Sequence, residues 1–457
     1  MTNQETTNKV DILIGSPNQD FFEIIQVVLQ GFYPYQFRWL QTAESILSND
    51  YDFNPVLALI DGRYGTAQAN EWTQSTKMTF PNAKIIVLHN GRDLLDFAQV
   101  KKNGADEIMH INYDREFIAD MVLTMAPIDL EGDIPVAALL SVDTRDLLED
   151  TELNFDLFIH LPTNQKTIKY KREGSSVEKK VLDRFENANQ NMYVKKTQTK
   201  QFFEYARTMA SMKNMDSPVS ATEKLNKSKK FIYEIMSQFM NGSSSDYQEG
   251  RIILEKCKEI ITEFEFTQAM DPKNILKEVS RFSGHPRSIY NDAINLAAIA
   301  ALFAQAIEWP LAKCEDAALC GLLHNIGLAL LPTSTAGKSY EELTLEDQQE
   351  FRMYPERSVI MVKGKKVPLN PEVSEGILMH RERADGTGFP KSLKSEKINE
   401  MGKLLGLSYL YLEATSLEKG TRAYTPEAAI KNFKDEALKG NELFDIILTT
   451  KLAKKLI

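Results

Sequence analysis

The first part of the chain alternates short apolar runs with amphipathic stretches. Strand-like apolar runs lie at residues 10–16, 36–40, 56–62, 84–90 and 106–111. Stretches with helical spacing of apolar positions lie at residues 20–30, 43–49, 92–104 and 115–125. Continuous apolar strands that alternate with helices are typical of a parallel sheet covered by helices on both faces. Residues 1–127 are therefore predicted to form a doubly wound α/β domain.

The pattern changes after residue 127. Shorter strand-like pieces at residues 155–161, 166–174 and 191–196 are separated by turns, and a helical stretch follows at residues 199–212. Short strands of this kind, joined by turns and followed by one helix, predict a small β-rich module over residues 128–212.

From residue 213 the pattern is helical almost to the end of the chain. A polar linker at residues 214–228 contains Ser220 and Glu223 in the spacing of a helix capping box. The segment at residues 293–307 is apolar nearly all round, which predicts a buried central helix. Residues 213–457 are therefore predicted to form an all-α domain.

Composition limits the class of protein. With 457 residues the chain is too long for one ordinary core, and 43% hydrophobic with 26% charged residues is typical of a soluble globular protein. The net charge of −10 argues against a general nucleic-acid surface, and no apolar run approaches the roughly 18 residues that cross a membrane. The N-terminus lacks a signal-peptide pattern, and three cysteines without a CxxC pair fit a reducing compartment. We therefore expect a cytoplasmic protein that does not bind DNA and has no membrane-spanning segment.

Three motifs occur in order in the C-terminal part. They are LLHNIG at residues 322–327, HRERADGTGFP at 380–390 and TRAYTPEAAI at 421–430. Together they resemble the His-Asp step, the signature loop and the following arginine segment of HD-GYP domains, and the resemblance covers roughly residues 220–450. Members of that family are Fe- or Mn-dependent phosphodiesterases that linearise cyclic di-GMP. The resemblance therefore implies an HD-GYP-like helical fold and offers this chemistry.

The resemblance also implies a set of metal ligands, most of which this sequence lacks. The family uses a His early in a long helix, a His-Asp pair, a His-Pro pair, a His-His pair and a final Asp. The corresponding positions are Tyr290, His324-Asn325, Tyr354-Pro355, His380-Arg381 and Tyr409, and Leu328 stands where a lysine is expected. An amide binds transition metals far more weakly than a carboxylate does, and a guanidinium repels a cation. We therefore expect no catalytic residue and no resident metal, with His324, Asn325 and His380 as vestigial positions.

The number of histidines in the C-terminal part leads independently to the same expectation of no resident metal. Only His285, His324 and His380 follow residue 220, and His285 precedes the long helix. Two or three imidazoles cannot build a multi-metal cage, so His324 and His380 are interpreted as hydrogen-bonded core histidines.

The signature-like loop retains the residues that set its shape. It comprises Asp385, Gly386, Thr387, Gly388, Phe389 and Pro390. In the family this loop also makes protein contacts, including contacts with diguanylate cyclases, although Asp-Gly is equally ordinary turn chemistry. Asp385 and Glu382 are candidate partner contacts. Arg422 matches an arginine that meets guanine or phosphate in active relatives, and it could equally be a solvated charge. Arg381 and Arg383 could supply phosphate contacts.

Residues 9–127 resemble the receiver domain of response regulators, which has a flavodoxin-like fold. Asp61, at the end of an apolar strand, matches the phosphoacceptor. Receivers need acidic residues after the first strand to hold Mg²⁺, a Ser or Thr after the fourth and a Lys after the fifth; the residues here are Ser16-Pro17, His89 and Ile111. With no carboxylate expected near Asp61, its phosphorylation is disfavoured, and Asp61 is interpreted as a loop-capping residue. A receiver without its switch commonly serves as a dimerisation or docking module.

These observations leave three functional hypotheses. The first is a non-catalytic signalling or scaffold protein of the cyclic di-GMP network, which contacts other signalling proteins such as diguanylate cyclases or forms a homodimer. The second is an effector that binds cyclic di-GMP without hydrolysing it. The third is a metal-dependent cyclic di-GMP phosphodiesterase whose ligands come from outside the motif positions. We favour the first because ligands are missing from several separate motifs.

Overall fold

A computed structural model describes most of the chain. The described residues are 10–29, 35–48, 53–90, 95–111, 115–128, 134, 138–142, 144–161, 166–188, 192–212, 221–240, 247–264, 272–283, 289–331, 340–416, 424–441, 443 and 445–457. The chain divides into two compact units, Met1–Asn226 and Lys227–Ile457. The division falls within helix α8 (Ala221–Met240), and the boundaries at residues 127/128 and 212/213 stay predictions. Ser220, His285 and Arg422 lie outside the described residues.

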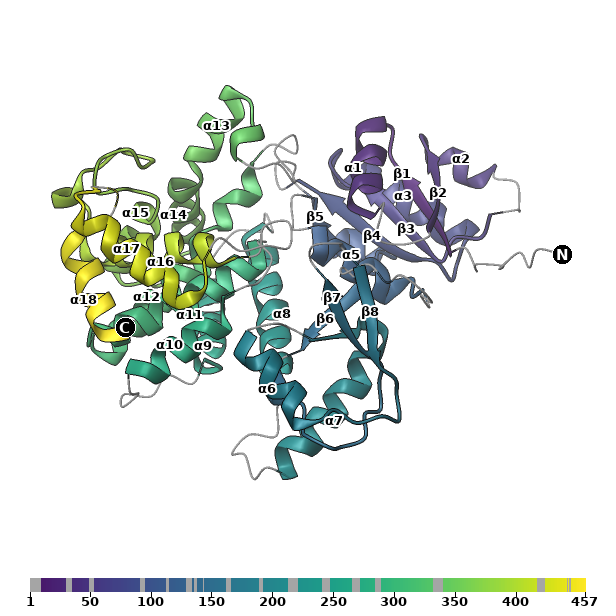
Figure 1. The fold of residues 1–457 in the computed structure, drawn as a ribbon. Coiled ribbons are helices and arrows are strands. Elements are labelled where there is room, and N and C mark those ends of the chain that lie inside the picture. The colour runs from purple at the N-terminus through teal and green to yellow at the C-terminus, as the bar shows by residue number, and fades with distance from the viewer. Residues whose placement is uncertain are drawn as a thin grey trace. The chain divides into compact units, whose positions relative to one another are not determined.

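A parallel five-stranded sheet opens the first unit (Figure 1). Its strands, in the spatial order β2-β1-β3-β4-β5, are β2 (Tyr35–Leu40), β1 (Val10–Gly15), β3 (Leu57–Asp61), β4 (Lys84–His89) and β5 (Glu107–His110). The connecting helices are α1 (Gln19–Leu29), α2 (Glu44–Leu47), α3 (Thr66–Thr79), α4 (Phe97–Lys102) and α5 (Arg115–Met125). This order is that of a flavodoxin-like doubly wound sheet, which confirms the predicted fold class.

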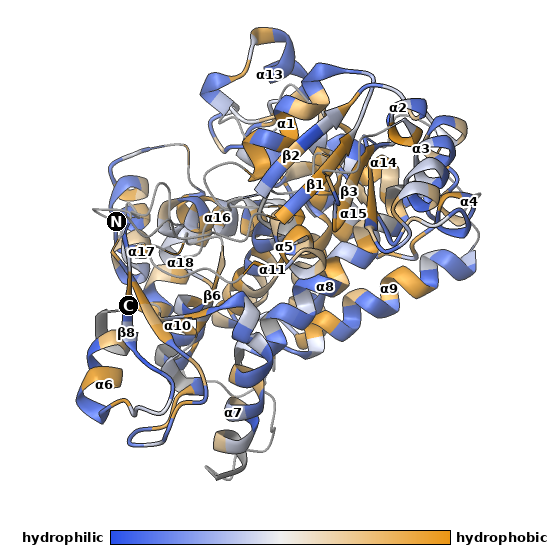
Figure 2. Ribbon diagram, turned by 90° about the vertical axis from the view of Figure 1, so that its right-hand side faces the viewer, coloured by the Kyte–Doolittle hydropathy of each residue, from blue (hydrophilic) through white to orange (hydrophobic). Residues whose placement is uncertain are grey.

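Burial explains why these segments form strands. Every residue of β3 is buried, as expected for a parallel strand with helices on both faces. In Figure 2 strands β1 and β3 are largely hydrophobic, whereas the edge strand β2 carries more polar residues. Helix α3 was not predicted because its sequence is mostly polar. It is nevertheless anchored by the fully buried Ala69 and by Trp72, which is 1% exposed.

The middle module consists of a small antiparallel sheet and two helices. The strands, in the order β6-β9-β7-β8, are β6 (Leu139–Val142), β9 (Met192–Lys195), β7 (Leu157–Leu161) and β8 (Lys166–Lys171). The helices are α6 (Lys179–Ala188) and α7 (Thr199–Met212). Three of the strands and α7 confirm the predicted β-rich pattern. The structure adds β6, which is only four residues long, and α6, which is rich in charged residues.

The second unit is helical in its described residues. After α8 come α9 (Tyr247–Thr262), α10 (Pro272–Arg281), α11 (Ile289–Ala306), α12 (Leu311–Leu323), α13 (Leu345–Arg352), α14 (Tyr354–Gly364), α15 (Pro371–Met379), α16 (Glu400–Thr415), α17 (Pro426–Leu438) and α18 (Ile446–Leu456). Helix α11 is buried nearly all round, as its apolar sequence predicts. It packs against α12 and α16, and α15 packs against α12, α14 and α16. This core holds the ends of α12 and α15 in place.

A close helix contact fixes the position of α12. A Cβ atom at Gly321 would lie 2.4 Å from the Ala297 backbone of α11, so a larger residue at position 321 would force the two helices apart. Gly321 is also the residue whose carbonyl meets His324, which links the packing to the site described below. Among the described residues, no helix is both long enough and apolar enough to cross a membrane.

Candidate functional site

Two histidines occupy equivalent places at the centre of the second unit. His324 directly follows α12 and His380 directly follows α15. The Nδ1 atom of His324 lies 2.7 Å from the carbonyl of Gly321, and that of His380 lies 2.6 Å from the carbonyl of Ile377. Because a carbonyl only accepts hydrogen bonds, both Nδ1 atoms carry the proton when the rings are neutral, and each Nε2 atom keeps its lone pair.

A tyrosine hydroxyl meets the lone pair of His380. Tyr354, the first residue of α14, has its hydroxyl oxygen 2.7 Å from His380 Nε2, so the phenol donates and the imidazole accepts. Burial lowers the pKa of His380 well below its usual value, and the neighbouring His324 lowers it further. His380 is therefore neutral at physiological pH, which is the state that this hydrogen bond requires.

The other motif positions gather around the two imidazoles. The rings of His324 and His380 are 5.0 Å apart, and the ring of Tyr409 from α16 lies 5.9 Å from the first and 5.8 Å from the second. Asn325 donates its amide to the carbonyl of Ile289 over 2.7 Å, next to the buried Tyr290 at the start of α11. In the described part of the chain the buried Oδ1 atom of Asn325 has no hydrogen-bond partner. The structure thus brings together four of the five positions at which the resemblance implies ligands: His324-Asn325, Tyr354, His380 and Tyr409.

Arg381 lies between two aromatic rings. Its guanidinium carbon is 4.1 Å from the ring centre of Tyr409 and 5.0 Å from that of Phe389. Its Nη1 atom is 3.5 Å from a carboxylate oxygen of Glu413, and the side chain is 14% exposed. Arg381 therefore joins the signature-like loop to α16 by cation–π contacts and one ion pair.

Glu382 fixes the backbone of the segment that directly follows the signature-like loop. It is 4% exposed, and its two carboxylate oxygens accept the backbone N–H groups of Lys391 over 2.7 Å and Leu393 over 2.8 Å. Between these two residues, Ser392 adopts a left-handed backbone with φ of 53°, which costs roughly 1–2 kcal/mol for a non-glycine residue. The two charge-assisted bonds offset that cost. Glu382 is thus buried inside the chain, which corrects its interpretation as a partner contact.

The tip of the loop is built from local turn chemistry. One oxygen of Asp385 accepts both the backbone N–H and the hydroxyl of Thr387, over 2.8 and 2.7 Å. Gly386 has φ of 83°, and a Cβ at Gly388 would lie 2.4 Å from the backbone nitrogen of Arg383. Both glycines are therefore required by the backbone, whatever contacts the loop makes outside.

The donor set does not fit the metal ions that the resemblance implies. Paired Fe or Mn ions need several carboxylates and imidazole lone pairs directed at one point. In this cluster the lone pair of His380 is taken by Tyr354, an amide stands at Asn325, and the carboxylate of Glu413 faces the guanidinium of Arg381. The positive charge of Arg381 would also repel a cation.

A second candidate site lies at the carboxyl edge of the parallel sheet. Asp61, the last residue of β3, is fully buried and accepts the hydroxyl of Ser16 over 2.7 Å. Arg63 donates to Asp61 through its backbone nitrogen, Nε and Nη2, over 3.1, 2.9 and 2.8 Å. The same guanidinium donates to both oxygens of Asp20 on α1, over 3.2 and 3.0 Å.

Arg63 therefore stands between two carboxylates. Although burial opposes it, the hydrogen bonds to Asp61 and Asp20 raise the pKa of Arg63 above its usual value, so the guanidinium is always charged. The expectation that no carboxylate lies near Asp61 was wrong, because Asp20 of α1 binds the same guanidinium as Asp61 does. The sequence analysis missed both Arg63 and Asp20; an arginine two residues after the aspartate was the available signal.

Two buried histidines follow on the neighbouring strands. His89 ends β4 and His110 ends β5, and their rings are 5.1 Å apart. Burial lowers the pKa of His89 to about 4 and, together with the neighbouring His89, lowers that of His110 to about 3. Both are neutral at physiological pH. Ile111, at the position of the receiver lysine, is 3% exposed.

Comparison with known proteins relates the second unit to a family. Residues 272–443 match the family described as HD domain. The chain is 25% identical over 162 residues to Cyclic di-GMP phosphodiesterase PA4108 of Pseudomonas aeruginosa, covering 35% of this chain and 39% of that protein. It is 32% identical over 106 residues to Cyclic di-GMP phosphodiesterase PdeB of Borreliella burgdorferi, covering 23% of this chain and 27% of that protein. The chain thus matches less than half the length of either relative.

Solved structures were also found for both units. Bd1817, a HDG"Y"P protein from Bdellovibrio bacteriovorus, is 17% identical with a TM-score of 0.40, covering 69% of this chain and 98% of that one. A response regulator from Thermotoga maritima is 15% identical with a TM-score of 0.22, covering 26% of this chain and 97% of that one.

Proposed function

We propose that this chain, whose second unit is an HD domain related to cyclic di-GMP phosphodiesterases, is a non-catalytic signalling protein that acts through protein contacts. The observation that carries the proposal is the hydrogen bond from the Tyr354 hydroxyl to His380 Nε2, over 2.7 Å. In a metal site, Nε2 of His380 would be the ligand atom. The Nδ1 atom of His380 already donates to a carbonyl, as the second nitrogen of a metal-binding histidine does. In this protein the hydroxyl hydrogen of Tyr354 occupies the lone pair that would bind the ion.

Arg381 supports the same proposal. Its guanidinium supplies a fixed positive charge, and Tyr409, Phe389 and Glu413 hold it in place. A permanent charge held by the protein replaces the charge that a metal would bring, yet it cannot generate a nucleophilic hydroxide. The chemistry left to the cluster is structural, because it fixes the loop against α16.

The contact surfaces that we propose are the signature-like loop at residues 385–390 and the receiver-like sheet domain. Asp385 and Thr387 bond each other within the loop, and Glu382 fixes the backbone that follows it. A preformed loop loses little entropy on binding. In the sheet domain the ion pairs of Arg63 occupy Asp61, so this domain would act without phosphorylation. Partners of this class are other signalling proteins, such as diguanylate cyclases, or a second copy of the chain.

The decisive experiment measures metal and hydrolysis together. We expect full-length protein purified with Mn²⁺ and Fe²⁺ to hold far less than one ion per chain and to form no linear pGpG from cyclic di-GMP. A matched variant, Tyr354→His with Arg381→His, restores two imidazoles and should raise bound metal, because it removes the competing hydrogen and the repelling charge. About two ions per wild-type chain, or measurable pGpG, would refute the proposal.

A second candidate function is cyclic di-GMP binding without hydrolysis, and the position of Arg381 favours keeping it. Its guanidinium lies between two aromatic rings and retains 14% exposure, which suits contact with a phosphate or a guanine. Calorimetric titration with cyclic di-GMP, with and without Mn²⁺, tests this candidate. Heat that disappears in Arg381→Gln but persists in Arg352→Gln would establish it, and no heat at high micromolar ligand would eliminate it.

A further inference from the structure

Strand β8 forms an open edge of the antiparallel sheet in the middle module. It stands at one end of the strand order β6-β9-β7-β8, and in the described part of the chain it pairs with β7 alone (Figure 1). The four residues of the opposite edge strand, β6, are buried or half-buried, whereas Lys166, Ile168 and Lys169 of β8 are exposed. Because an edge strand presents a row of backbone N–H and C=O groups, β8 offers these groups to another strand.

The side chains along this edge are basic. Residues 166–172 contain three lysines and one arginine and no acidic residue, in a chain whose net charge is −10. Lys169 pairs with Asp156 of the neighbouring segment over 2.7 Å. The other three cations form no ion pair with any carboxylate in the described part of the chain. The edge therefore carries an excess of positive charge.

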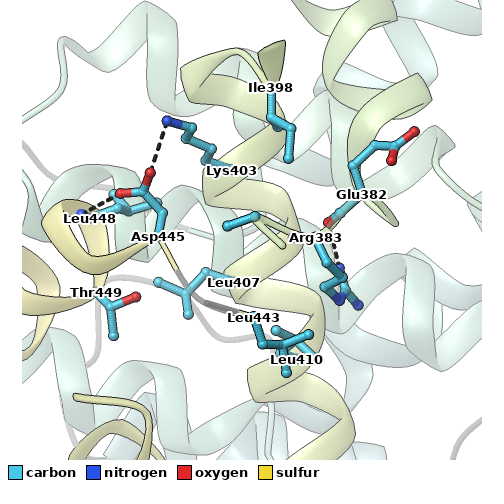
Figure 3. A pocket seen from close by; sticks show the side chains of 13 residues that line it. Glu382, Arg383, Ile398, Lys403, Leu407, Leu410, Leu443, Asp445, Leu448 and Thr449 are labelled. Atoms are coloured by element: carbon cyan, nitrogen blue, oxygen red, sulfur yellow. Dashed lines mark hydrogen bonds and ion pairs between the residues drawn. The ribbon is translucent and has the colours of Figure 1, made fainter. Parts of the chain in front are cut away.

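This edge differs from the charged groups of a small niche in the second unit. The niche lies between the turn at residues 382–384 and helices α16 and α18 (Figure 3). There Lys403 pairs with Asp445 over 2.8 Å, and Arg383 donates to the carbonyl of Glu382 over 2.9 Å. The cations of the niche are thus engaged inside the protein, whereas most of those on the β8 edge are left for a partner in solution.

Apolar side chains lie beside the cations of β8. Ile168 is the cross-strand partner of Ile159 in β7, and Ile159 packs against the core of the module. Residues that face each other across two strands project from the same face, so Ile168 lies on the core face although it is 43% exposed. Leu161, two residues after Ile159 and therefore on the same face, is 37% exposed. A strand added beside β8 could cover Ile168 with an apolar side chain of its own.

We propose that β8 pairs with an extended acidic segment of a partner protein. Backbone hydrogen bonds along the edge would supply affinity, and carboxylates of the added strand would meet the lysines. The same lysines disfavour pairing between the β8 edges of two copies of this chain, because like charges would then face each other. This surface is additional to the loop and the sheet domain, so the inference goes beyond the proposed function.

The first test addresses the backbone. It uses full-length protein and a fluorescein-labelled heptapeptide of alternating glutamate and valine, whose binding is followed by anisotropy. Only every second residue of an added strand directs its N–H and C=O groups at the edge. N-methylation of one alternating set of peptide amides should therefore abolish binding, whereas methylation of the other set should preserve it. Both methylated peptides keep the charge of the parent peptide.

The second test addresses the charge. The double variant Lys166→Gln with Lys171→Gln removes two cations of the edge, so we expect the affinity for the peptide to fall roughly tenfold. The matched control is Lys180→Gln with Lys200→Gln, which removes two exposed lysines of α6 and α7 and lowers the net charge equally. The control should bind as the wild type does. Neither variant should lower the melting temperature, because all four side chains lie outside the core.

Three results would overturn the proposal. They are no binding at about 1 mM peptide, equal effects of the two methylated peptides, and equal loss of affinity in the two lysine variants. Single-stranded poly(U) RNA that binds more tightly than the peptide, and only while Lys166 and Lys171 are present, would also overturn it, since the edge would then recognise phosphate. The readouts involve neither metal, nor hydrolysis, nor the loop at residues 385–390, so failure here is distinguishable from failure of the proposed function.

Discussion

The two candidate sites, one in each unit, differ in the charged groups that they contain. In the parallel-sheet domain the anionic groups Asp61 and Asp20 are both present, and Arg63 provides the cation between them. In the helical unit the cluster consists of neutral rings, an amide and a guanidinium. Removal of Arg63 alone would leave the two carboxylates of the first site without a cation, whereas several substitutions would be needed to bring carboxylates into the second. The first site is therefore an ion-pair cluster, and the second is a cluster of rings.

The largest expected effect of a single substitution concerns the ion-pair cluster of Asp61, Arg63 and Asp20. Arg63→Ala leaves the fully buried Asp61 without its cation, so we expect a loss of roughly 3–5 kcal/mol in the free energy of unfolding, measured with urea. If Arg63 alone keeps a metal ion out of this cluster, Mg²⁺ at about 10 mM should raise the free energy of unfolding of the variant by roughly 1 kcal/mol or more. It should not change that of the wild type. Asp20→Asn is the control, because the half-exposed Asp20 should cost at most about 1 kcal/mol. If Mg²⁺ does not stabilise the Arg63→Ala variant, then Arg63 is not what keeps a metal ion out of the first site.

Acid should unfold the sheet domain through its histidines. His89 and His110 have folded pKa values of about 4 and about 3, below the unfolded value of 6.5. Their contribution to stability is therefore complete above pH 6.5 and is lost as pH falls toward 4, by roughly 1.4 kcal/mol per pH unit for each histidine. Unfolding followed by circular dichroism at several pH values between 7 and 4 should show this slope of the free energy of unfolding against pH. His89→Gln should reduce it by about half, and an unchanged slope would show that His89 is not neutral in the folded protein.

The smallest effect concerns the ring cluster around His324 and His380. Tyr354→Phe removes the donor to His380 Nε2 and leaves a buried acceptor unpaired, so we expect a loss of roughly 1–3 kcal/mol in urea unfolding. Tyr247→Phe, at a tyrosine that is 73% exposed, is the matched control and should change little. A stable Tyr354→Phe protein that binds Mn²⁺ would mean that the phenol, rather than the whole donor set, keeps the metal out. The contrast between the two sites would then disappear.

The sequence predicted the elements whose burial leaves a clear pattern. The strands of the parallel sheet are continuous apolar runs, and α11 is apolar all round, so both were recognisable. Helix α3 was not predicted because its buried face consists of Trp72 and four small or polar residues within a polar sequence. Strand β6 is too short to show a period, and its partner β9 is more than fifty residues later in the sequence.

The candidate sites were predictable only where motifs named the positions. The order of motifs indicated that His324, Tyr354, His380 and Tyr409 would meet, and they do. The bond between Tyr354 and His380 could not be predicted, because it depends on how α14 begins beside α15. The role of Arg63 was hidden for a similar reason, since a flexible side chain reaches two carboxylates separated by 41 residues. Partners at long sequence distance are set by packing, which no local pattern contains.

The two hydrogen bonds that Glu382 accepts have a consequence for sequence variation. Glu382 holds peptide nitrogens at residues 391 and 393, and it makes no demand on the side chains that those residues carry. Substitutions at these two positions can therefore change the side chains while both hydrogen bonds to Glu382 persist.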